Sequence, residues 1–254
     1  MAHGYEDRLV AYLDILGWED ATSRLAPEKL IEALEVVHEE PRSFNEAERK
    51  RLIEFGKQPG VQINQGYLKI HAAAFSDNIA ISQPKSFGTR IFSIRRICLQ
   101  LLQLGFLTRG AVSVGQLYHE DNMVFGPALN RAHAIEVKQA VFPRIICDDA
   151  VVAMLKDQAD FKHEVISDTD GKYVVNLYRP AFLKAPACLW KQFLDGYYRF
   201  DHTLAIIENN IIHLAADTRK LDKWKYMKGH VTAAKKRLFE FIGADLPNEY
   251  RPHE

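Results

Sequence analysis

One apolar segment near the start of the chain constrains the fold more than any other feature. RLVAYLDILG, from Arg8 to Gly17, begins at a charge, continues through large apolar side chains and ends at a glycine. Such a run is typical of a strand that is buried on both faces. We therefore predict that a core strand opens the protein. Asp14 interrupts it, and a buried carboxylate is costly unless it binds a cation or hydrogen-bond donors.

The segments that follow predict an α+β fold. The helix expected over residues 91–105 has an apolar stripe, with Arg95, Arg96, Gln100 and Gln103 on the opposite face. The elements expected in chain order after the first strand are a helix over 27–41, a short polar helix and surface loop over 43–65, a hairpin over 68–82, the helix over 91–105 and a strand over 106–118. This order predicts a ferredoxin-like antiparallel sheet with helices packed on one face.

The second half of the chain continues the sheet and then becomes helical. A DG turn at Asp170 and Gly171, between short β-branched runs, predicts a second hairpin. The other elements expected here are a helix over 125–140, a short strand over 144–148, and two helices over about 189–209 and 218–242.

Composition excludes several classes of protein. Of the 254 residues, 47% are hydrophobic, and 33 Lys and Arg balance 33 Asp and Glu, so no global charge draws the chain to nucleic acid or to an anionic membrane. The longest uncharged run, residues 97–108, is far shorter than the ~20 apolar residues of a membrane helix. The acidic N-terminus is unlike a signal peptide, which predicts a cytoplasmic protein. Cys98, Cys147 and Cys188 are interpreted as small buried hydrophobic residues.

Two aspartates suggest a metal site. Asp14 lies near the end of the first strand and Asp77 lies at the tip of the expected hairpin. In a ferredoxin-like sheet we expect the first strand to lie beside the second and third, so the two carboxylates can converge at one edge. Such oxygens suit Mg²⁺ or Mn²⁺. Taken singly, each has a plainer interpretation, a strand-end cap for Asp14 and a turn former for Asp77.

A possible phosphate cradle follows the first strand. Backbone N–H groups of Leu16, Gly17 and Trp18 precede an expected helix and could hold a polyphosphate. The alternatives are simple turn chemistry for the glycine and a core position for the tryptophan side chain.

Several segments together resemble one family. YLDILGW, AFSDNIAIS, RGAVSVG and VFGPALNRAHAIE, in this order and at these spacings, are similar to the class III nucleotidyl cyclases. The pyrimidine cyclases of bacterial Pycsar antiphage systems are more similar still, because they share the FSDN hairpin, the VFGPAL segment and the FPRII strand. The resemblance covers residues 10–148 and divides the chain into a cyclase-like catalytic domain over 1–180 and a helical extension over 181–254 that packs on it.

The resemblance implies roles for individual residues. Asp14 and Asp77 match the two metal-binding aspartates, and the backbone carbonyl of Ile15 would complete a two-metal Mg²⁺ or Mn²⁺ site. Asn130 matches the asparagine that orients the ribose, and it would reach into the partner's site, because class III sites form at a homodimer interface. Asn78, beside Asp77 in the FSDN hairpin, joins the expected nucleotide-binding residues.

The chain also departs from the family pattern at three positions. The arginine expected four residues after the asparagine is Ala134, so we expect Arg131 or Arg109 to meet the charge of the transition state. The lysine and aspartate that read a purine edge fall on Ala73 and Met123. Their loss favours a pyrimidine, with UTP expected ahead of CTP.

The expected activity is therefore conversion of UTP to 3′,5′-cyclic UMP and pyrophosphate, as a second messenger for a separate effector in antiphage defence. The alternatives are an inactive cyclase-like nucleotide-binding regulator and a purine cyclase. Nucleic-acid binding through residues 218–240, which hold eight Lys or Arg against two acids, is the least favoured interpretation. The histidines show no zinc-binding spacing.

Overall fold

A computed structural model of the chain describes residues 4–56, 69–85, 91–158, 161–179, 189–214 and 217–243. The chain divides into two compact units, Met1–Asn176 and Leu177–Glu254, and each is described by itself. Within the described residues, no helix has the length and apolar character needed to cross a membrane.

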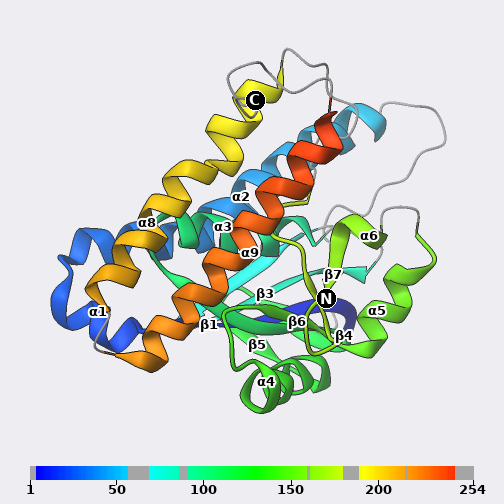
Figure 1. Cartoon of the computed structure of the whole chain (residues 1–254). Helices are drawn as coiled ribbons and strands as arrows, with labels where there is room; N and C mark the ends of the chain where they lie inside the picture. The colour runs from blue at the N-terminus through cyan, green and yellow to red at the C-terminus, as the bar shows by residue number, and fades with distance from the viewer. Residues whose placement is uncertain are drawn as a thin grey trace. The chain divides into compact units, whose positions relative to one another are not determined.

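The first unit is built on one mixed sheet with the strand order β2-β3-β1-β4-β6-β8-β7, and β5 pairs with β4 (Figure 1). All pairings are antiparallel except that of β4 with β6. The strands are β1 (Glu6–Leu16), β2 (His71–Phe75), β3 (Asn78–Pro84), β4 (Leu107–Glu120), β5 (Met123–Phe125), β6 (Ile145–Cys147), β7 (Val165–Ser167) and β8 (Tyr173–Val175). The α+β, ferredoxin-like prediction is confirmed.

The neighbours of the first strand differ from the prediction. β1 pairs with β3 and β4, and β2 is the edge strand beyond β3. The reason is the hairpin itself, because a tight turn places β3 antiparallel to β2 and leaves only one of the two strands free to pair with β1. The hairpin turn is nevertheless level with the end of β1, because Asn78 is the register partner of Asp14.

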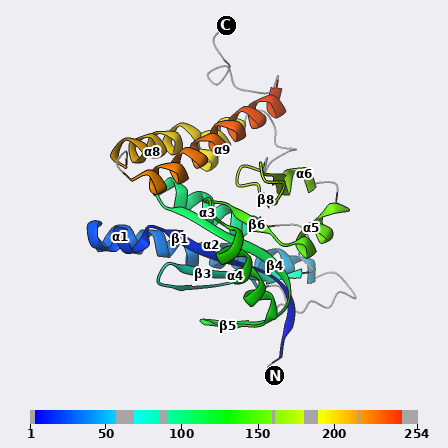
Figure 2. The same cartoon turned by 60° about the horizontal axis from the view of Figure 1, so that its bottom comes forward.

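Helices cover both faces of the sheet rather than one. Figures 1 and 2 show α4 on the face opposite to α2 and α3. The side chains of β1 alternate accordingly: Val10 packs with Ala128 of α4, whereas the fully buried Leu9 and Leu13 point to the other face. The helices of this unit are α1 (Trp18–Arg24), α2 (Pro27–Gly56), α3 (Phe92–Gln103), α4 (Pro127–Gln139), α5 (Asp149–Lys156) and α6 (Phe161–Glu164).

Two helix predictions need correction. α2 does not end at Pro41 but continues to Gly56, because Pro41 and Glu40 are buried and Glu40 pairs with Arg96 of α3 (Nε to Oε2, 2.5 Å). Arg95, assigned to the polar face of α3, is only 1% exposed. Its guanidinium pairs with Glu164 (2.5 Å) and donates to the carbonyl oxygen of Asn176 (2.7 Å), which satisfies the buried charge.

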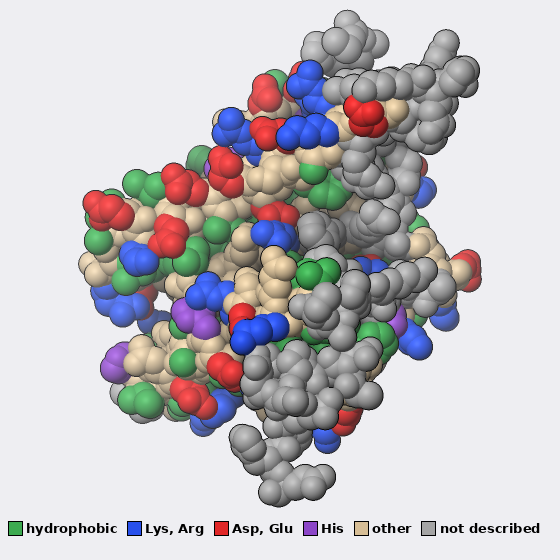
Figure 3. Space-filling view, turned by 90° about the horizontal axis from the view of Figure 1, so that it is seen from above, with side chains coloured by type: hydrophobic (Ala, Val, Ile, Leu, Met, Phe, Trp, Pro, Cys, Tyr) green, Lys and Arg blue, Asp and Glu red, His purple; other side chains and the backbone are tan. Residues whose placement is uncertain are grey.

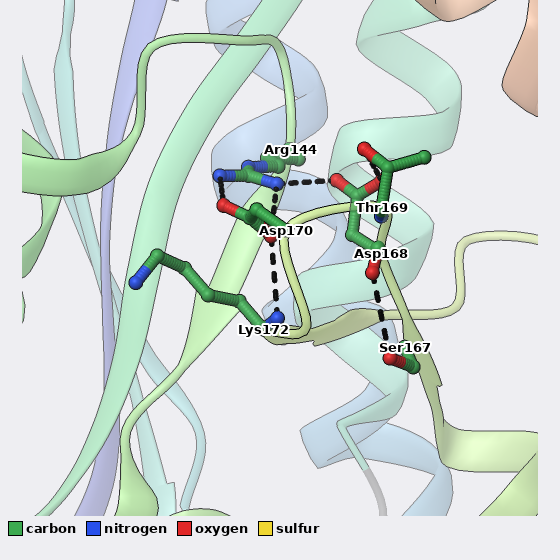
Figure 4. Close-up of polar contacts among 6 residues, drawn as sticks. All are labelled: Arg144, Ser167, Asp168, Thr169, Asp170 and Lys172. Atoms are coloured by element: carbon green, nitrogen blue, oxygen red, sulfur yellow. Dashed lines mark hydrogen bonds and ion pairs between the residues drawn. The ribbon is translucent and has the colours of Figure 1, made fainter.

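The predicted DG hairpin is present as β7 and β8, with Gly171 in the left-handed region at φ 80°. Arg144, next to the first residue of β6, holds its turn (Figure 4). The guanidinium contacts Asp168 and Asp170, each at 2.5 Å, so the hairpin is fixed to the neighbouring strand by charge-assisted hydrogen bonds.

The second unit contains α7 (Trp190–Gln192), a π-helical segment η4 (Phe193–Tyr198), α8 (Phe200–His213) and α9 (Thr218–Ile242). The single helix predicted over 189–209 is broken at Arg199, which has φ 46°. The prediction for α9 is confirmed. Its lysines are largely engaged with acids: Lys228 pairs with Glu208 (2.9 Å) and Lys235 with Asp201 (2.6 Å). Figure 3 shows basic and acidic side chains interspersed on the face it displays.

The cysteine prediction is confirmed for two residues. Cys98 and Cys147 are free and buried, and burial raises the pKa of each thiol to about 12. Cys188 lies outside the described residues.

Candidate functional site

The end of β1 and the turn of the β2–β3 hairpin bring the two predicted metal ligands to one edge of the sheet. In the register of β1 and β3, Asp14 is opposite Asn78, the residue after Asp77. The backbone N–H of Ile15 donates to the carbonyl oxygen of Asp77 at 2.8 Å. Ser76, at φ 57°, makes the turn tight enough for this contact. Asp14, Ile15 and Asp77 therefore form one local cluster.

Arg109 joins this cluster from β4. It is the direct cross-strand partner of Asp14, and its Nε–H donates to Oδ2 of Asp14 at 2.8 Å. Oε1 of Glu136, on α4, is also 2.8 Å from the same Nε. The Asp14 and Glu136 side chains are 15% and 4% exposed, while that of Arg109 is 32% exposed. Of Arg109 and Arg131, the two arginines predicted to meet the charge of the transition state, Arg109 is the one in contact with Asp14.

A hydrogen-bond chain orients Asp77. The Tyr12 hydroxyl donates to Oδ1 of Asn78, and Nδ2 of Asn78 donates to Oδ1 of Asp77 at 2.8 Å. Burial raises the pKa of Tyr12, and the nearby charges of Glu136, Asp14 and Asp77 raise it further. The phenol therefore stays protonated and continues to donate to Asn78. Asn78, held in this way, donates in turn to Asp77 and orients its carboxylate.

The charges at this edge suit a divalent cation. The Arg109 guanidinium is paired with the carboxylates of Asp14 and Glu136, and Asp77 adds a third carboxylate at the neighbouring hairpin turn. Burial raises the pKa of Glu136, as does Asp14, while Arg109 lowers it. Among the described residues, no group of three or more His, Cys, Asp or Glu could hold a metal ion. A cation here would take hard oxygens from Asp14, Asp77 and the Ile15 carbonyl and complete its shell with water or phosphate oxygens.

The predicted phosphate cradle lies next to these residues in the chain. Gly17, at φ 77°, ends the turn after Leu16 and caps the seven-residue α1. The Trp18 side chain is buried against Phe106, with ring centroids 5.7 Å apart. Trp18 is therefore a core side chain, and only its backbone N–H remains for the predicted role.

The other predicted residues lie apart from the aspartates. Arg131 is bound elsewhere, because its Nε donates to Ser113 and lies 3.1 Å from the Asp148 carboxylate, and Ser113 is four positions along β4 from Arg109. Asn130 is exposed on α4. Ala73 is in the middle of β2, and Met123, 59% exposed, begins β5.

Sequence reasoning missed Tyr12 and Glu136. A period-2 pattern places Tyr12 on the same strand face as Asp14, which was an available signal. Glu136 continues the row of buried helix positions Ala128 and Ala132 at intervals of four residues. A carboxylate in such a row indicates a buried cation nearby.

No protein-family model matches this chain, and no curated protein matches it. Among solved structures, it is similar to a bacterial light-regulated adenylyl cyclase, with 16% identity, a TM-score of 0.44, and coverage of 71% of this chain and 94% of the other. The monomeric guanylyl cyclase domain of the RhoGC fusion protein from the aquatic fungus Blastocladiella emersonii gives 12% identity, a TM-score of 0.39, and coverage of 67% and 95%.

The guanylyl cyclase Cya2 gives 14% identity, a TM-score of 0.37, and coverage of 69% and 92%. Because these identities are at most 16% and the TM-scores are below 0.5, neither activity nor substrate is carried over from these proteins.

Proposed function

We propose that this chain is a homodimeric, metal-dependent nucleotidyl cyclase that converts a pyrimidine nucleoside triphosphate into its 3′,5′-cyclic monophosphate and pyrophosphate. The observation that carries the proposal is the meeting of Asp14 and Asp77 at one sheet edge, joined through the Ile15 to Asp77 hydrogen bond of 2.8 Å, with Arg109 beside them. The ordered resemblance over residues 10–148 supports the same activity.

The reaction forms a bond between the ribose O3′ and the α-phosphorus and breaks the bond to pyrophosphate. A divalent cation supplies the chemistry that lowers the pKa of the 3′-hydroxyl and stabilises the charge on the phosphates. Asp14, Asp77 and the Ile15 carbonyl would hold it. Arg109 would bind phosphate oxygens, the task left open by Ala134, and the N–H groups from Leu16 to Trp18 would contact the polyphosphate.

A second copy of the chain would complete the site. The partner's Asn130 would orient the ribose, and its exposure on α4 supports this role. Val137 of α4 and Val141, two residues after the helix ends, are exposed apolar side chains, at 65% and 64%. Exposed apolar side chains of this kind are typical of a protein interface.

The base would be a pyrimidine, with UTP ahead of CTP. Ala73 and Met123, at the positions that read a purine, have no side-chain donor and no strong acceptor for a purine edge. The cyclic product would act as a second messenger for a separate effector protein in antiphage defence.

The test is to incubate the purified chain with UTP, CTP, ATP or GTP and Mn²⁺, and to identify the products by mass spectrometry. Cyclic UMP or cyclic CMP is the expected result. If only cyclic AMP or cyclic GMP forms, the chain is a purine cyclase. If nucleotide binds without any cyclic product, the chain is an inactive nucleotide-binding regulator, an alternative that the alanine at position 134 favours.

A further inference from the structure

A single N–H group of Arg109 lies between two carboxylates. Its Nε is 2.8 Å from Oδ2 of Asp14 and 2.8 Å from Oε1 of Glu136. The N–H points to Asp14, which accepts the hydrogen bond. Oε1 of Glu136 is buried and accepts none among the described residues. The Nε–H of Arg109 therefore has two equally close acceptors, and it donates to Asp14.

The acceptor in use is also a ligand in the proposed function. A cation bound at Asp14 needs carboxylate oxygens, and a guanidinium on the same carboxylate competes for them through charge repulsion. Metal binding at Asp14 is therefore favoured when the Arg109 N–H leaves Oδ2 of Asp14. A released guanidinium stays near the site only if another acceptor is already in reach, and Glu136 Oε1 satisfies this condition at 2.8 Å.

We infer that Glu136 is a positioning residue that receives Arg109 when a divalent cation takes Asp14. This inference rests on the proposed function. In the absence of metal, Arg109 serves as the counter-ion of Asp14. When metal binds, the Nε–H turns to Glu136, which keeps the guanidinium beside the site for the phosphates of the substrate. Glu136 itself touches neither metal nor substrate.

The test measures binding of Mn²⁺ alone to the full chain, by the loss of the electron paramagnetic resonance signal of free Mn²⁺. Glu136→Leu removes the second acceptor, so Arg109 should remain on Asp14 and weaken Mn²⁺ binding roughly tenfold. In the Arg109→Ala background there is no guanidinium for Glu136 to accept a hydrogen bond from. Adding Glu136→Leu to that variant should change the Mn²⁺ affinity less than about twofold.

Simple charge attraction makes a different prediction. If Glu136 acts only through its negative charge, Glu136→Leu weakens Mn²⁺ binding equally with and without Arg109, and the inference is overturned. Glu136→Gln gives a second criterion, because it keeps an acceptor oxygen without the charge. It should bind Mn²⁺ more tightly than Glu136→Leu, and equal affinities of the two variants would contradict the inference.

Two controls separate this inference from the proposed function. Asp7→Asn removes a carboxylate from the same strand at an exposed pair with Lys85, and should leave Mn²⁺ binding unchanged. Asp14→Asn should abolish binding at the site. If the wild-type chain binds no Mn²⁺ and makes no cyclic product, the proposed function and the inference fail together. If Mn²⁺ binds and product forms but Glu136 and Arg109 are not coupled, the inference alone fails.

Discussion

At the residue scale, the proposed metal site depends on two carboxylates that neighbouring strands hold in place. Asp14 is fixed by its position opposite Arg109, and Asp77 by the hydrogen bond from Asn78. Glu136, the other carboxylate next to Arg109, lies on α4 rather than on β1 or the hairpin, so it is not placed to replace either aspartate. The proposed activity therefore has to be sensitive to the loss of either aspartate.

Asp14→Ala and Asp77→Ala should each lower cyclase turnover by on the order of 10³-fold, because metal stabilisation of the transition state is worth several kcal/mol. Cyclic product would be quantified by mass spectrometry, with circular dichroism as the check that each variant is folded. An undiminished rate in either variant would remove that residue from the metal site.

A second residue-scale cluster predicts acid sensitivity. Oγ of Ser82 accepts from Arg8 (3.0 Å) and contacts Nδ1 of His119 (2.9 Å), and the His119 ring lies 5.3 Å from that of His71. Burial, and then the nearby positive charges, lower the pKa of His71 to about 4 and of His119 to about 3. The native state therefore holds both rings neutral.

The native state should become less stable as the pH falls from about 6.5 toward 4. Below pH 6.5 these two histidines bind protons in the unfolded chain but stay neutral in the native state. The free energy of unfolding therefore falls by up to about 1.4 kcal/mol per pH unit for each histidine. Urea unfolding at several pH values measures this slope, and His119→Gln should make it shallower. Parallel stability curves for the two proteins would show that His119 is not responsible.

At the scale of elements, the pairing of β1 with β4 sets the position of Arg109 relative to Asp14. Gly110 is opposite Leu13 in this pairing. A Cβ atom at Gly110 would lie 2.2 Å from the carbonyl oxygen of Tyr12 and 2.8 Å from Cδ2 of Leu13. The two strands approach this closely only because position 110 has no side chain.

Gly110→Ala should therefore lower the free energy of unfolding by roughly 2–3 kcal/mol, as overpacking of a buried site does. Gly229→Ala is the control, since Gly229 lies inside α9 with nothing within 4 Å of an added Cβ. That change should raise stability by about 0.5–1 kcal/mol through helix propensity. Thermal unfolding followed by circular dichroism measures both, and equal effects would contradict the close-approach argument.

The elements that sequence reasoning found are those whose signals are local. The turns at residues 76–78 and 170–171 and the α3 and α9 helices depend on neighbouring residues, and all were predicted. Pro41 and Arg95 were misjudged because their burial depends on distant partners, and Glu164 is 69 residues away from Arg95. In the candidate site, the cost of a buried carboxylate and the hairpin turn predicted roles for Asp14 and Asp77. The contact of Arg109 with Glu136 depends on how α4 packs over the sheet, and spacing along the chain does not reveal that packing.

At the scale of the whole molecule, the proposed site needs residues from two copies. Asp14 and the partner's Asn130 would act in the same site, so each dimer would hold two composite sites. Two inactive variants, each lacking a different residue of the shared site, can then complement each other in a mixed dimer. This property separates a shared site from one that a single chain completes.

A mixture of the inactive variants Asp14→Ala and Asn130→Ala, unfolded and refolded together in equal amounts, should recover up to about a quarter of wild-type activity. Random pairing makes half of the dimers mixed, and each mixed dimer has one intact site. Each variant refolded alone is the control. No recovery in a mixture shown to contain mixed dimers would place Asp14 and Asn130 in the same chain's site.

The position of β1 in the sheet has a consequence for how the proposed reaction could be controlled. β1 is paired with β4 from Glu6 to Leu16 and with β3 from Arg8 to Asp14. Amide protons of a strand that is paired on both sides exchange with solvent only in large openings of the structure, so hydrogen exchange should be slowest here. Local unfolding of β1 is therefore unsuited to switch the proposed activity on and off. Regulation would instead act through the binding of substrate, metal ion or a second subunit at the site.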